Sequence, residues 1–274
     1  MDYYISGDSI TNNISTIQFF SKDYYDFYIK NFIDNNNFVE CLEDINTSTL
    51  IFITKVDYLN KFYQFVKKLN KKYVLITHYG DDKAGINTNI LNHPNLIKWY
   101  GQNMCIKSNK TCGIPIGLVN NFWKYTNINI LKENSNNPKE KLLYINFAIS
   151  IEYRNKVLDD LIKKGFTKNI KYEPSKWEKY IKDLSTHKFC ISPKGTGADC
   201  HRTWECLYLG VIPIVEKSTE MSFFDDLPIL FVDSYDEISV EYLNKIYKNF
   251  HNKSFNLEKL SINYWTNKIK AHFT

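Results

Sequence analysis

Two arginines stand out in a sequence whose other basic residues are lysines. The chain has 274 residues with 35 lysines and arginines together, and only Arg154 and Arg202 are arginine. Arginine differs from lysine in its planar guanidinium, which can bind two oxygens of a phosphate group at once. We therefore expect both positions to need that geometry, and phosphate binding is the chemistry that such a group serves.

Arg202 lies in the stretch from Ile191 to Val215, ISPKGTGADCHRTWECLYLGVIPIV, which is predicted to form a strand, a glycine-containing loop, a helix and a second strand. In this arrangement a phosphate-bearing ligand binds at the helix N-terminus. A helix that starts near Ala198 would present unpaired N–H groups and the positive end of its dipole. The glycines before it leave further N–H groups uncovered. The stretch therefore predicts an anion-binding loop made of Lys194, Gly195, Thr196 and Gly197.

The predicted helix places polar residues along one edge. His201 and Arg202 are within reach of Glu205, at spacings of four and three, and the apolar stripe predicted to pack inward is Trp204, Leu207 and Tyr208. An arginine on a diphosphate and a glutamate that accepts both ribose hydroxyls would together form a nucleotide-diphosphate site. The alternative is an ordinary surface ion pair between Arg202 and Glu205, with glycines that only turn the chain.

Arg154 occupies an equivalent position in the preceding unit. Leu142 to Phe147 is predicted as a strand, and a helix is predicted from about Ile151 to Lys164, so Arg154 also falls early in a helix that follows a strand. Two arginines that converge from neighbouring strand ends would clamp one diphosphate. Together with Lys194 they would stabilise the negative charge that develops on the diphosphate oxygen when its bond to the transferred group breaks.

The run from Ser192 to Ile214 resembles the donor-site signature of exostosin-like glycosyltransferases. The stretch from Asn92 to Asn120, with HPNLIKWYGQN and GIPIGLVN, is similar to a segment that joins the two halves of related sequences. With DLPIL at Asp226 to Leu230, the resemblance covers roughly residues 75 to 235. It implies an α/β protein with two Rossmann-like domains (the GT-B architecture), an active site in the cleft between them, and inversion at the anomeric carbon.

The first half of the chain is predicted to form a parallel sheet. Leu50 to Thr54 and Tyr73 to Thr77 have the composition of buried strands, and Val56 to Lys68 between them has helical spacing. Ligands of such sheets bind beyond the carboxyl ends of the strands. The polar residues that follow these two strands are Asp57, His78, Asp81 and Asp82.

A transferase of this kind needs a base that takes the proton of the acceptor hydroxyl. His78 and Asp81 are the candidates, and histidine is the natural choice because its ordinary pKa lies near neutrality. The alternative is that His78 hydrogen-bonds a loop while the aspartates cap the next segment.

The organisation predicted from composition is an acceptor-side domain over residues 1–125, a linker over 126–141, and a nucleotide-sugar domain over 142–255. The linker is poor in large apolar residues and rich in Asn, Lys and Glu. Residues 256–274 are expected to form a helix that packs back toward the first domain. The other elements expected in the second half are Ser175 to Leu184, Leu227 to Val232, Val240 to Phe250 and Leu257 to Phe273.

Composition excludes some classes of protein. A formal charge of +5 with 43% hydrophobic residues describes a globular chain, and the absence of a Lys-rich block interleaved with aromatics argues against nucleic-acid binding. No run of apolar residues is long enough to span a membrane and no secretory signal is evident, so we expect a soluble, cytoplasmic protein. Eukaryotic exostosin-like enzymes usually carry an N-terminal membrane span. The Lys and Asn excess fits an AT-rich genome, such as that of a protist or of a virus, and a viral protein would act in the infected host cell.

The sequence has no pattern typical of a metal site. Six cysteines lack CxxC spacing and no Asp-x-Asp occurs, so we expect free thiols, no metal and no cofactor. Cys105 and Cys112 could pair if the protein were secreted, and Cys200, inside the glycine-loop stretch, is best explained as a small packing residue.

These observations predict a glycosyltransferase that moves a sugar from a nucleotide-diphosphate donor, with UDP favoured, to a hydroxyl of a glycan or glycoprotein. Two alternatives stay open. One is a fucosyltransferase-like enzyme that uses GDP-fucose. The other is a nucleotide- or carbohydrate-binding module without catalysis.

Overall fold

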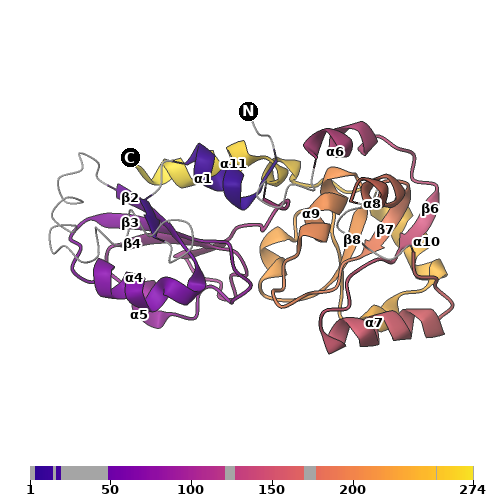
Figure 1. The fold of residues 1–274 in the computed structure, drawn as a ribbon, viewed down its shortest axis with the longest axis horizontal. Coiled ribbons are helices and arrows are strands. Elements are labelled where there is room, and N and C mark those ends of the chain that lie inside the picture. Colours follow the sequence, from indigo (N-terminus) through magenta and orange to yellow (C-terminus); the bar gives the residue numbers. More distant parts are fainter. Residues whose placement is uncertain are drawn as a thin grey trace.

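The computed structural model describes residues 4–14, 17–19, 49–120, 127–169, 177–250 and 252–273. Within these ranges the chain forms two separate sheets whose strands are all parallel (Figure 1). The first has the order β1 (Ile17–Phe19), β2 (Thr49–Thr54), β3 (Lys72–Thr77), β4 (Leu96–Gly101) and β5 (Thr111–Gly113). The second has the order β6 (Lys141–Tyr144), β7 (His187–Ile191), β8 (Ile212–Glu216) and β9 (Leu230–Val232). The prediction of an α/β fold with two parallel sheets is confirmed.

Helices cover both faces of the first sheet. Alternate residues of β3 point to opposite faces, as they must in a strand. Tyr73 and Leu75 pack in one cluster with Phe62 of α4 (Leu59–Val66), next to α5 (Thr88–Leu91). Val74 and Ile76 pack in the other, under α1 (Gly7–Asn13) and α11 (Ile262–Lys270). The helix predicted from Val56 begins as a 3-10 turn, η1 (Val56–Tyr58).

The second sheet is covered in the same way. Phe189 and Ile191 of β7 pack against α7 (Glu152–Lys163) and α10 (Val240–Phe250). Cys190, between them in sequence, packs on the opposite face in a cluster with residues of α6 (Ile128–Asn134), α8 (Trp177–Leu184) and α9 (His201–Tyr208). The remaining short elements are η4 (Met221–Phe224), η5 (Tyr235–Glu237), η6 (Leu257–Leu260) and η7 (Ala271–Phe273).

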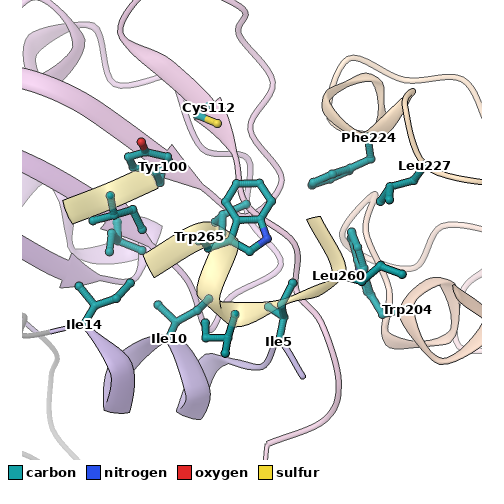
Figure 2. Packing of buried hydrophobic residues seen from close by; sticks show 14 of the residues in the cluster. Ile5, Ile10, Ile14, Tyr100, Cys112, Trp204, Phe224, Leu227, Leu260 and Trp265 are labelled. Carbon is teal, nitrogen blue, oxygen red and sulfur yellow. The ribbon is translucent and has the colours of Figure 1, made fainter. Parts of the chain in front are cut away.

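One apolar cluster joins the two halves (Figure 2). Trp265 of α11 lies in it with side chains from the first sheet and from α1, and the second half contributes Trp204, Phe224 and Leu227. The hydroxyl of Tyr100 on β4 donates to the backbone oxygen of Lys268 at 3.2 Å. The C-terminal helix therefore lies on the first sheet, although the chain reaches it directly from the second half.

The stretch expected to be a linker is partly structured. Residues 128–134 within it form α6, and its two isoleucines and one leucine lie on the side that packs toward α8. Leu131 is fully buried there. The sequence analysis did not predict this helix because its composition is mostly polar. Its three apolar residues are nevertheless enough to pack it against the second half. In the part of the chain described, no helix is both long and apolar enough to cross a membrane.

Gly117→Ala is expected to lower stability more than Gly165→Ala, although both glycines have positive φ angles, 69° and 86°. A Cβ on Gly117 would lie 2.2 Å from the backbone oxygen of Ile5, which is held by the N–H of Leu118 at 2.7 Å, whereas one on Gly165 meets nothing within 4 Å. The left-handed conformation alone costs a non-glycine residue about 1–2 kcal/mol. Urea unfolding of both variants measures the additional effect of the clash, and equal midpoints would show that there is none.

Candidate functional site

The carboxyl ends of the two sheets meet at the segment from Pro115 to Gly117, which follows β5. His78, directly after β3, has its Nε2 3.1 Å from the Pro115 oxygen. The Ile116 N–H donates to Asp199 Oδ2 at 2.7 Å, and His201 Nδ1 lies 2.7 Å from the Gly117 oxygen. Three successive residues are thus each bound by a different side chain. One of these side chains belongs to the first half, and the other two belong to the loop and helix that follow β7. We call residues 115–117 the junction segment.

Asp199 connects three parts of this junction. Its side chain is buried, and Oδ1 accepts a hydrogen bond from Trp204 Nε1 at 2.7 Å. Its backbone N–H donates to Asn103 Oδ1, across to the first half, at 3.0 Å. Burial raises the pKa of Asp199 to about 7, against the N–H groups of Ile116, Trp204 and Cys200, which lower it.

These contacts correct the predicted start of the helix. α9 begins at His201 rather than near Ala198, because Asp199 is held in the junction and Cys200 is extended, with φ −142° and ψ 150°. The N–H of Asp199 is therefore used by Asn103 and is not available to an anion in this structure.

The two glycines of the loop are explained by close approaches. A Cβ on Gly197 would lie 2.7 Å from Nδ2 of Asn103, and one on Gly195 would lie 3.0 Å from Nη2 of Arg154. The Gly195 N–H donates within the loop to the Gly197 oxygen at 3.0 Å. Lys194 and Thr196 are exposed, and the Lys194 ammonium lies 4.7 Å from the centre of the Tyr153 ring.

Arg154 binds the backbone of this loop. Its Nε donates to the Lys194 oxygen at 2.9 Å, Nη2 to the Pro193 oxygen at 3.1 Å, and Nη1 to the Ala148 oxygen at 3.1 Å. The guanidinium is buried, and all three of its nitrogens are engaged with backbone carbonyls. The structure thus places the predicted clamp residue against the loop, where it fixes the loop's shape.

Arg202 keeps an unused donor. Its Nε donates to the Asn146 oxygen at 3.0 Å, and its guanidinium carbon lies 5.8 Å from the centre of the Phe147 ring. Nη1 is buried without a hydrogen-bond partner, and so is Oδ1 of Asn146. A charged donor without a partner is costly, so this atom marks a place where a ligand oxygen would be stabilised.

Glu205 differs from its predicted position. It is buried, and its two oxygens accept hydrogen bonds from Trp177 Nε1 at 2.9 Å and from the Tyr180 hydroxyl at 2.8 Å. Neither the predicted polar edge facing the loop nor the alternative surface ion pair with Arg202 is found among the described residues. Sequence spacing gave the right separation along the helix, but α8 covers this edge.

His78 is buried at the junction. Because a carbonyl only accepts, the contact with Pro115 requires the proton to be on Nε2, which leaves a lone pair on Nδ1. Nδ1 has no partner. Burial, the largest cause, lowers the pKa of His78 to about 4; the bond to Pro115 raises it in part, and nearby His201 lowers it further. The imidazole is therefore neutral at pH 7.

The aspartates considered as candidates for the base, or as its neighbours, do not contact the junction segment. The side chains of Asp81 and Asp82 are exposed, and the Asp81 backbone oxygen accepts from Asn103 Nδ2 at 3.2 Å. A hydrogen bond with Asp57 raises the pKa of Asp82. Of the residues expected to supply the base, only His78 is brought into the junction.

Four residues of the site were given no role in the sequence analysis: Gln102, Asn103, Asn146 and Asp199. Asn103 adopts a left-handed conformation with φ 53°, which asparagine tolerates better than most residues. Its position two residues after the end of β4, a strand that the sequence analysis did not predict, is a signal that could have identified it.

No protein-family model matches this sequence, and no curated protein matches it either. The described cysteines, Cys105, Cys112, Cys190, Cys200 and Cys206, are free thiols, and Cys41 lies outside the described residues. Within the described ranges, no group of three or more His, Cys, Asp or Glu side chains is arranged to hold a metal.

His78→Gln is expected to weaken the acid dependence of stability between about pH 4 and 6.5. A pKa lowered from 6.5 to about 4 means that folded His78 binds fewer protons than the unfolded chain in this window, so its contribution to stability is lost as the pH falls. Glutamine can still donate to Pro115 but does not titrate. Melting temperatures of both proteins across this range measure the effect. The difference between them should be constant above about pH 7 and change below it; one that stays constant throughout contradicts the assignment.

Proposed function

We propose that this protein is a glycosyltransferase that uses a nucleotide-diphosphate sugar, with UDP favoured, and transfers the sugar to a hydroxyl of a glycan or glycoprotein. The observation that carries the proposal is the pair of unpartnered groups at the two strand-end edges. Arg202 Nη1, in the second half, is a charged donor without an acceptor. His78 Nδ1, in the first half, is a neutral base without a donor.

The donor side of the proposed reaction uses Arg202 and the glycine loop. When the bond between the anomeric carbon and the diphosphate breaks, the electron pair stays on the leaving oxygen, where a guanidinium stabilises the negative charge. Lys194 and Thr196 are exposed on the same loop and can approach a phosphate. Arg154 acts on this side as a positioning residue, because its three hydrogen bonds hold the loop in place.

The acceptor side uses His78 as the general base. The acceptor hydroxyl gives its proton to Nδ1 while its oxygen bonds to the anomeric carbon from the face opposite the leaving group, which inverts the configuration. A pKa of about 4 makes His78 a weak base in the unliganded protein. The negative charge of a bound diphosphate would raise that pKa and improve its match to the task.

A role for Glu205 in binding the ribose would require a rearrangement. Both of its oxygens already accept hydrogen bonds, from Trp177 and Tyr180, in a buried position. Each oxygen retains acceptor capacity, but a ribose could use it only if one of these aromatic side chains moved. Two measurements distinguish the alternatives. Preference for UDP or for GDP distinguishes a UDP-sugar transferase from an enzyme that uses GDP-fucose, and nucleotide binding without turnover would favour a binding module.

Arg202→Lys is expected to weaken UDP binding by about tenfold or more, because an ammonium cannot bond Asn146 and a phosphate oxygen in the fixed geometry of a guanidinium. The melting temperature of each protein with UDP and with GDP measures binding, since a ligand of the folded state raises it. The control is Lys182→Ala, which removes an exposed charge paired with Glu178 on α8. A wild-type protein unaffected by either nucleotide would contradict the proposed function. An Arg202→Lys variant that responds like wild type would exclude Arg202 as the phosphate ligand.

Catalysis is expected to continue in EDTA, because Arg202 and Lys194 supply the positive charge that a divalent metal supplies in other transferases. The rate of UDP-sugar hydrolysis by the purified protein, before and after chelation, is the measurement. A rate that falls to background and returns with manganese would overturn this part of the proposal.

A further inference from the structure

Three adjacent strand ends of the first sheet converge on one small region. His78 follows β3 and Gln102 follows β4, which lies between β3 and β5, so the ring of His78 passes the end of β4 to reach Pro115. The Gln102 N–H donates to the Thr77 oxygen at 2.9 Å, which places the two residues side by side. The Gln102 amide nitrogen donates to the Gly80 oxygen at 2.7 Å. The Gln102 side chain therefore lies across the turn that contains His78.

His78 and Gln102 each have a hydrogen-bond acceptor without a donor. The Gly80 carbonyl requires the amide nitrogen of Gln102 to face it, so Oε1 points elsewhere. Oε1 of Gln102 and Nδ1 of His78 are buried without hydrogen-bond partners, in side chains that are 2% and 3% exposed. Native proteins leave few such atoms unsatisfied, and a catalytic role is one of the reasons for an exception.

The turn between them carries a second mark of a binding site. Tyr79 has φ 68°, a left-handed conformation that is unfavourable for a bulky residue. Backbone strain of this kind persists where the surrounding structure imposes it, and it is concentrated at ligand-binding sites. The strained residue is thus next to His78 in sequence, and the Gln102 side chain is hydrogen-bonded to the same turn.

We propose that Gln102 Oε1 and His78 Nδ1 bind two neighbouring hydroxyl groups of the carbohydrate acceptor. This inference rests on the proposed glycosyltransferase function and adds the chemistry that selects its acceptor. Two hydrogen-bond acceptors favour a ligand with two O–H donors and disfavour a carboxylate or phosphate, which has none. The hydroxyl at Nδ1 loses its proton to His78 as its oxygen bonds to the anomeric carbon. The hydroxyl at Gln102 keeps its proton and orients the sugar ring.

Access to the two acceptors requires part of the surrounding chain to move. Both atoms are closed to solvent, and the junction segment beside them is held by Asp199 and His201 from the second half. Within this proposal, opening of these contacts would admit the sugar and would couple acceptor binding to the loop that follows β7.

The test uses the full-length protein with nitrogen-15-labelled histidine, saturated with UDP. Methyl glycosides of glucose, galactose, mannose, xylose and fucose are added in turn, and the resonance of His78 Nδ1 is followed, since an O–H donor to its lone pair shifts it. At least one glycoside is expected to bind. Gln102→Met, which keeps the length of the side chain without its acceptor, is expected to weaken that glycoside by about tenfold or more.

Two variants control for other effects of the substitution. Gln64→Met makes the same change on an exposed face of α4 and is expected to bind like wild type. Gln102→Glu keeps acceptor oxygens while losing the bond to Gly80, so it is expected to retain more affinity than Gln102→Met. If Gln102→Met does not fold, the comparison of Gln102→Glu with wild type replaces it: retained affinity supports the inference, and a loss of about tenfold opposes it.

The outcomes separate this inference from the proposed function. A protein that binds UDP in the same samples but whose His78 resonance responds to no glycoside overturns the inference alone, and the two acceptors are then satisfied by water. Equal affinity of wild type and Gln102→Met removes Gln102 from the site. Failure to bind UDP or GDP overturns the proposed function first.

Discussion

The structure depends on a buried carboxylate that is held between its two halves. Asp199 accepts from the backbone of the junction segment and from Trp204, and its own N–H is bound by Asn103. A buried carboxylate is costly unless donors surround it, so these contacts are satisfied together or lost together. The loop after β7, the start of α9 and the end of β4 are therefore positioned by one buried residue.

This arrangement explains why the glycine-loop stretch is built as it is. Position 197 is glycine because a Cβ there would collide with Asn103, and a Cβ at position 195 would lie close to Arg154. The loop is shaped by contacts with its own protein on both sides, which leaves Lys194, Thr196 and Arg202 Nη1 as the groups that can meet a ligand. A sequence pattern that suggests an anion site can thus owe much of its character to packing.

The sequence was informative where periodicity decides structure. The strands at residues 50–54 and 73–77, the helices near 152–163 and 240–250, and the parallel sheets follow from runs of apolar residues that the core requires. Short elements such as α1, β5 and α6 were not predicted, because they contain too few residues to establish a period. The site was predicted less completely. The position after a strand end pointed to His78, and the scarcity of arginine pointed to Arg202. The contacts of the site could not be predicted, because they join residues far apart in sequence: Asp199 binds Ile116, 83 residues away, and His78 binds Pro115, 37 residues away.

The placement of α11 has a consequence for the order in which the chain folds. This helix completes the apolar face of the first sheet beside α1, so the first and the last α-helices of the described chain pack in one cluster (Figure 2). During synthesis the first sheet emerges long before the helix that covers it, and its apolar face stays incomplete until residues 262–270 have been made. Contacts between such distant parts of a chain form slowly, and an uncovered apolar face is prone to aggregation. We therefore expect the first half to be the last to reach its final packing, even though the ribosome produces it first.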